Sequence, residues 1–133
     1  MPSKKEHKKN PKQKRGDHRS TSLKSGDMVM IIAGGNKEKR PIKGQVGKLK
    51  AFTGKYNDRA IVEGLNMITK HQRQTTPDRP AGKIQKEASI HVSNLMYYVE
   101  KLKKPVRLKH NLLEDGSKVR GYINPETKQF VQI

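Results

Sequence analysis

The chain has 133 residues, of which 30 are lysine or arginine and 12 are aspartate or glutamate, so its formal net charge is +18 at pH 7. This length holds one domain, and hydrophobic residues, at 31%, are too few to surround a large buried catalytic cavity. The absence of cysteine excludes disulfides, iron–sulfur clusters and cysteine nucleophiles, and the charge indicates a polyanionic partner. We expect neither a secretory signal nor membrane insertion, because no apolar stretch is long enough for either.

Residues 1–22 form a basic segment in which, after Met1, no large apolar side chain occurs. Eight lysines and arginines stand there against Glu6 and Asp17, so the segment has a net charge of +6. Such a composition cannot bury enough apolar surface to offset the entropy of ordering the chain. We predict a basic N-terminal arm that is disordered when free and orders on nucleic acid; the alternative is a solubilising tail.

The apolar pattern begins at Leu23, and three short β-rich runs follow at residues 28–33, 44–52 and 59–63. Glycine or a polar turn closes each run, and a bulge or bend is expected where Gly47 interrupts the second. Runs of this length between turn residues are typical of all-β proteins. No stretch has a sustained helical period, so any helix should be limited to a single turn.

Residues 66–71 and 84–88 are predicted to form the two arms of a long hairpin around an exposed polar loop at residues 72–83. That loop contains two prolines and a glycine but no large apolar side chain. A loop of this length in so small a domain is usually functional or disordered. Residues 91–99 then supply a further core segment.

Residues 105–123 predict a C-terminal hairpin, because the Asp115-Gly116 pair favours a tight turn between two strands, and residues 129–133 suit an edge strand. We therefore predict an all-β fold, in which residues 23–133 form a small closed or nearly closed barrel with hairpin extensions. The expected inward-facing side chains are Val29, Ile31, Val46, Leu49, Ile61, Ile90, Val92 and Leu95.

The residues that could carry catalysis do not form a recognisable constellation. The five histidines lack the spacing of a metal site, and Gly34-Gly35 is not followed by the lysine of a phosphate loop. Asp27 suits a turn or a side chain–backbone contact before the first strand, and Glu114 with Asp115 suits the hairpin turn. We predict no enzyme, no metal and no cofactor.

Basic side chains are instead spread over the loops and strands, as expected for contacts to RNA phosphates. Aromatic residues are only 5% of the chain, which favours recognition of folded RNA through its backbone over stacking of single-stranded bases. The alternative is a solvated basic surface. The predicted RNA-binding residues are Lys24, Lys37, Lys39, Arg40, Lys43, Lys48, Lys50, Lys70, His71, Arg73, Lys86, Lys109, Lys118 and Arg120.

Several stretches resemble one known family. Residues 24–34 and 43–49 together are similar to a KOW motif, whose glycines suit tight turns and close approach to a partner backbone. Residues 61–71 resemble the V-E-G-[IV]-N segment of the bacterial-type large ribosomal subunit protein twenty-four family. Residues 87–95 and 114–120 resemble its E-A-x-[IL]-x-[VI]-S-N strand and its E-D-G-K-K-V-R hairpin.

The resemblance implies an SH3-like barrel bound to the first domain of the large-subunit rRNA, where it nucleates early subunit assembly. It implies a monomer among neighbouring ribosomal proteins, in the cytoplasm or in an organellar ribosome. The hairpin tip is expected at the rim of the polypeptide exit tunnel, in reach of the nascent chain or tunnel-exit factors. The matching residues are Gln72, Arg73, Gln74, Thr75, Thr76, Pro77, Asp78, Arg79, Pro80, Ala81, Gly82 and Lys83.

The chain departs from the family pattern in a longer first loop, residues 35–42, and in the arm at residues 1–22. Both additions are expected to contact rRNA or a neighbouring protein. Two other classes remain as alternatives: a KOW transcription factor bound to RNA polymerase or nascent RNA, and a free-standing basic protein that binds the nucleoid or an anionic membrane.

Overall fold

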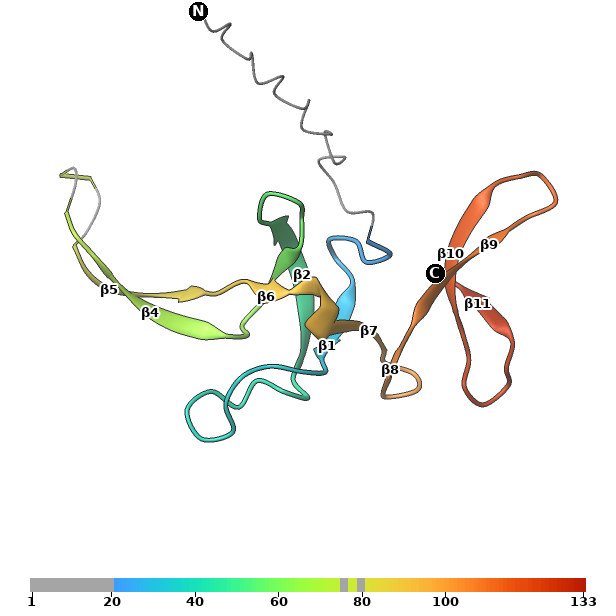
Figure 1. Cartoon of the computed structure of the whole chain (residues 1–133), viewed down its shortest axis with the longest axis horizontal. Helices are drawn as coiled ribbons and strands as arrows, with labels where there is room; N and C mark the ends of the chain where they lie inside the picture. Colours follow the sequence, from blue (N-terminus) through green and yellow to red (C-terminus); the bar gives the residue numbers. More distant parts are fainter. Residues whose placement is uncertain (1–20, 75–76, 79–80) are drawn as a thin grey trace, which may run out of the picture.

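The computed structural model describes residues 21–74, 77–78 and 81–133. Two extensions leave its central body in different directions (Figure 1). Within these residues the regular elements are β-strands and one 3₁₀ turn, Val92–Asn94. The all-β prediction is confirmed. The predicted arm lies outside the described residues, apart from its last two positions.

The central body is a six-stranded antiparallel sheet in the order β6-β3-β2-β1-β7-β8, consistent with a small β-barrel. Its strands are β1 (Met28–Ile31), β2 (Val46–Thr53), β3 (Arg59–Val62), β6 (Ile90–His91), β7 (Leu95–Val99) and β8 (Lys104–Val106). The side chains alternate along β1, where Val29 and Ile31 are buried and their neighbours are half-buried. The core also contains Leu23, which anchors the segment that precedes β1.

Five of the eight side chains predicted to face inward are buried, namely Val29, Ile31, Leu49, Ile90 and Leu95, whereas Val46, Ile61 and Val92 are half-buried.

The prediction for the third strand was wrong by one residue, because Ala60 and Val62 are the buried side chains and Ile61 is half-buried. Alternation along a strand permits only one of the two sets to face the core.

The irregularity predicted at Gly47 lies farther along β2, since the pairing with β3 shifts between Leu49 and Ala51. Gly47 instead permits a close approach of neighbouring segments. A Cβ atom there would lie 2.9 Å from Val62 Cγ1 and 3.0 Å from the Glu63 carbonyl oxygen. The sequence showed that the glycine was special but not which contact required it.

The first extension is the hairpin of β4 (Met67–Gln72) and β5 (Gly82–Glu87), which projects from the barrel (Figure 1). Its pairing runs from Met67 opposite Glu87 to Gln72 opposite Gly82. The two predicted arms are thus confirmed, with a correction to the loop: Gln72, Gly82 and Lys83 belong to the strands. Within the loop, Thr75, Thr76, Arg79 and Pro80 lie outside the described residues.

The second extension is a three-stranded sheet in the order β11-β10-β9, formed by β9 (Leu108–Leu112), β10 (Lys118–Ile123) and β11 (Phe130–Gln132). The predicted C-terminal hairpin and edge strand are confirmed, but the hairpin begins later than residue 105. Residues 104–106 form β8 and pair with β7. This edge position tolerates Pro105, because proline has no N–H to donate to a further strand.

Candidate nucleic-acid interface

In the structure the first loop is the whole connection between β1 and β2, residues 32–45, which contains the segment predicted at residues 35–42. It carries four predicted RNA-binding residues. Backbone pairing folds this loop, since Asn36 N–H donates to the Arg40 carbonyl (3.1 Å) and Arg40 N–H donates to the Asn36 carbonyl (2.9 Å). The loop therefore presents a defined set of exposed cations. These are Lys37, Lys39, Arg40 and Lys43, the first-loop group.

Gly35 explains why this tight fold is accessible to the chain. Its φ of +77° lies in the left-handed region that glycine adopts readily. A Cβ atom there would lie 2.5 Å from the Arg40 carbonyl oxygen and 2.6 Å from Ile42 Cγ1. Any larger residue at this position would push the two arms of the loop apart.

The hairpin β4–β5 carries a second set of predicted residues, the hairpin group, all of them exposed. Lys70 lies opposite Ile84 and Lys86 lies opposite Ile68, so each cation is paired across the ladder with a half-buried aliphatic residue. The group consists of Lys70, His71, Arg73 and Lys86.

Glu87 braces the base of this hairpin against the barrel. Its carboxylate accepts hydrogen bonds from Gly64 N–H (2.9 Å) and from Lys50 Nζ (2.9 and 3.0 Å). The Gly64 N–H, followed by Lys50, lowers the pKa of the Glu87 carboxyl, and the same contact with Glu87 raises the pKa of Lys50. Lys50, predicted to bind RNA, thus has a partner within the protein, although 47% of its side chain remains exposed.

Asn66 completes the base of the hairpin. Its φ of +53° turns the chain into β4, and its side-chain amide donates to the Ala88 carbonyl (3.3 Å). Ala88 N–H donates back to the Asn66 carbonyl (3.0 Å). The family-like segments at residues 61–71 and 87–95 therefore contact each other here, and this contact holds the hairpin in place.

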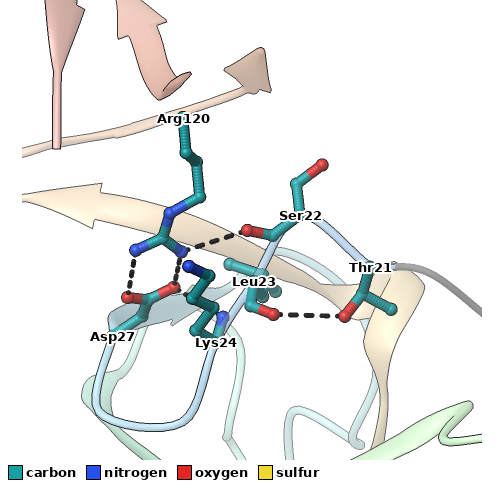
Figure 2. A network of polar contacts seen from close by, with 6 residues as sticks. All are labelled: Thr21, Ser22, Leu23, Lys24, Asp27 and Arg120. Carbon is teal, nitrogen blue, oxygen red and sulfur yellow. Dashed lines mark hydrogen bonds and ion pairs between the residues drawn. The ribbon is translucent and has the colours of Figure 1, made fainter. Parts of the chain in front are cut away.

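Near the C-terminus the predicted residues have different surroundings. Lys109 on β9 and Lys118 on β10 are exposed and form the C-terminal group. The Arg120 side chain is only 13% exposed, because its guanidinium pairs with the Asp27 carboxylate through two contacts of 2.5 and 3.0 Å (Figure 2). The same guanidinium donates to the Ser22 carbonyl (3.0 Å), and the Asp27 contact raises the pKa of Arg120.

This ion pair joins residues 93 positions apart and ties β10 to the segment before β1. Asp27 also accepts a hydrogen bond from Lys24 N–H (2.8 Å), which confirms its predicted role in the turn. Sequence reasoning missed the pair, because no local pattern connects a turn near the N-terminus with a strand near the C-terminus. The remaining predicted residues, Lys24 and Lys48, are exposed on this turn and on β2.

The described part of the chain contains no cluster of three or more histidine, aspartate or glutamate side chains that could hold a metal ion. Over those residues, too, no helix is long and apolar enough to cross a membrane. His91 has a structural contact instead, with its Nδ1 lying 2.7 Å from Ser93 Oγ at the start of the 3₁₀ turn.

Comparison with known proteins gives one consistent result. Residues 65–123 match the family model for the C-terminal domain of large ribosomal subunit protein uL24. The protein of that name from Geobacter metallireducens is 47% identical over 98 residues, which cover 74% of this chain and 83% of the relative. The uL24 proteins of Caldanaerobacter subterraneus subsp. tengcongensis and Alkaliphilus metalliredigens are 45% and 44% identical over 98 residues, covering 74% of this chain and 85% and 88% of theirs. The chain therefore belongs to the uL24 family of large ribosomal subunit proteins, as its motifs had indicated.

Proposed function

We propose that this protein is a structural constituent of the large ribosomal subunit, not an enzyme, and that it binds the first domain of the large-subunit rRNA. The observation that carries the proposal is the placement of exposed cations on the first loop and on two extensions that project in different directions (Figure 1). Phosphates brought together by folded RNA suit such a surface better than the regular backbone of a duplex. Family membership supports the subunit assignment.

The proposed phosphate contacts come from the first-loop, hairpin and C-terminal groups, together with Lys24 and Lys48. Lys50 can share in them through its exposed half, whereas Arg120 is assigned to holding β10 against the barrel. Because cations on separate parts of the fold would bind separate strands of rRNA, the protein would nucleate folding of that domain early in assembly. It would act there as a monomer beside other ribosomal proteins, in the cytoplasm.

The hairpin β4–β5 is the part that we place beside the polypeptide exit tunnel. It projects from the barrel and ends in a polar loop, so its tip can reach beyond the rRNA contacts of its base (Figure 1). The nascent chain or tunnel-exit factors are the partners proposed for the tip. The arm at residues 1–22, with its positive charge, is proposed to contact rRNA as well.

The decisive experiment measures the affinity of the purified protein for a transcript of the first rRNA domain, over a range of salt concentrations. The controls are a transcript of another rRNA domain and a duplex DNA of equal length. We expect preference for the first domain to persist as salt rises, and the slope of log K against log salt to report about 0.7–0.9 per neutralised phosphate. Equal affinity for all three nucleic acids would contradict the proposal.

Sedimentation from cell lysate tests the subunit assignment and the arm together. The full chain should remain with the large subunit through a high-salt wash, and a variant without residues 1–20 should dissociate at lower salt. An unchanged salt midpoint for the truncated variant would contradict the role of the arm. Release of the full chain to fractions that contain RNA polymerase would favour a transcription factor.

A further inference from the structure

The first loop curves around an open cavity that simple phosphate binding does not require. Its volume is about 670 Å³, within the range of small-ligand sites, and it is lined by residues 33–37 and 40–44. The side chains of Ala33, Pro41 and Ile42 form an apolar wall. The backbone of Gly34, Gly35 and Gly44 lines the rest of the cavity. A wall of this kind offers a nonpolar surface to a ligand.

Several hydrogen bonds hold the cavity in shape. Gly44 N–H donates to the Ile31 carbonyl (2.7 Å), which fastens the loop to the end of β1. The Gln45 side chain donates to the Pro41 carbonyl (3.0 Å), and Ile42 packs against the barrel core. Because the wall is connected to the core in this way, the cavity is a preformed feature of the loop.

Three members of the first-loop group, Lys37, Arg40 and Lys43, also line the cavity. The combination of an apolar wall with cations around it matches a nucleotide, whose base has two flat faces and whose phosphate is anionic. Asn36, a further lining residue, accepts from Glu38 N–H (2.9 Å) through its side-chain oxygen, and its amide NH₂ group can donate to a base edge.

We infer that the first loop binds one unpaired nucleotide of RNA, with the base in the cavity and the phosphate beside Lys37, Arg40 or Lys43. The inference rests on the proposed function and deepens it, because it assigns to one loop the recognition of a base that lies outside a helix. A base inside a duplex is stacked and paired, so it could not enter the cavity without leaving the helix.

The test is chemical probing of base reactivity in a transcript of the first rRNA domain, alone and in complex with the full chain. Ala33→Leu fills the cavity and leaves every charge in place. A second variant, Lys37→Gln/Arg40→Gln/Lys43→Gln, removes the cations and leaves the wall. The matched control, Arg107→Gln/Lys109→Gln/Lys118→Gln, removes three cations from residues 107–118.

We expect the wild-type protein to protect at least one unpaired base, and both first-loop variants to restore its reactivity to that of free RNA. Ala33→Leu should weaken binding about tenfold without changing its salt dependence, because it removes the nonpolar contacts of one base and no charge. The control variant should weaken binding but still protect the same base. Should Ala33→Leu fail to fold, the cation variant and its control still decide the matter.

Two negative outcomes are distinct. If the protein leaves no footprint on the transcript, the proposed function itself fails. If a footprint forms but contains no protected unpaired base, or if the first-loop variants protect the same bases as the wild type, the nucleotide site is contradicted and the proposed function stands.

Discussion

The two extensions of this protein both carry exposed cations but are supported in different ways. The hairpin β4–β5 pairs only with itself, and none of the residues in its two strands is buried. The pair β9–β10 is joined by β11 and rests on a second core formed by Val99, Val106 and Tyr122. Arg120 on β10 adds the ion pair with Asp27.

The difference teaches that exposed charge by itself does not distinguish a fixed surface from one that is ordered by its partner. An isolated two-stranded hairpin is only marginally stable in water, whereas a third strand and a packed face give stability of their own. We therefore expect the C-terminal sheet to be rigid before binding, and the hairpin β4–β5 to gain order on contact with rRNA.

The largest expected effect is the loss of the link between β10 and Asp27. Arg120→Ala would leave a carboxylate that is only 10% exposed without its cation, which should lower the free energy of unfolding by about 3 kcal/mol. Urea denaturation measures this loss. Asp27→Leu/Arg120→Met should recover most of it, because both charges are removed together. A loss no larger than that of Lys118→Ala would show that the pair contributes little.

The next test concerns β11, the third strand of the C-terminal sheet. A Cβ atom on Gly121 would clash with the Val131 carbonyl oxygen and with the ring of Phe130. Gly121→Ala should therefore loosen β11 and lower the free energy of unfolding by about 2 kcal/mol, as overpacking commonly does. Thermal denaturation measures the change, with Ser117→Ala in the exposed turn as the control. Unaltered stability and amide exchange in β10 would contradict the role given to β11.

A smaller and local effect is expected at the base of β4–β5. Since the pKa of Glu87 is lowered, its ionised form stabilises the folded hairpin above the ordinary glutamate pKa, and this contribution disappears as pH falls through the lowered pKa. Amide exchange in β4 and β5 should therefore become faster, relative to exchange in the barrel strands, as pH falls below about 4.3, the ordinary glutamate pKa. In Glu87→Gln the hairpin amides should exchange fast at every pH, because the ionised carboxylate is absent. Glu126→Gln should show the same pH dependence as the wild type.

The smallest effects concern single phosphate contacts. Lys70→Gln on the hairpin and Lys109→Gln on the C-terminal sheet should each reduce the slope of log K against log salt by about 1. Stability should stay within about 0.5 kcal/mol of the wild type, because both side chains are exposed. Binding titrations at several salt concentrations measure the slope, and an unchanged slope removes that residue from the interface.

Local patterns were sufficient to predict most of the strands. The hairpin at residues 66–88 and the turn at Asp115-Gly116 are confirmed, because turn residues and short apolar runs act over a few positions. The inward face of β3 was not predicted correctly, since the pairing shift between Leu49 and Ala51 is a property of two strands together. Which cations touch phosphate stays a prediction.

The sequence by itself determined the all-β class, the basic surface and the family, because composition, turn chemistry and short motifs are properties of neighbouring residues. Only the tertiary structure decided that Arg120 faces Asp27, that Glu87 braces the hairpin through Gly64, and that the first loop forms an open cavity. Each of these depends on contacts between groups that only folding brings within a few ångströms. A charged residue and its partner can then be far apart in the chain, and no local pattern records the pairing.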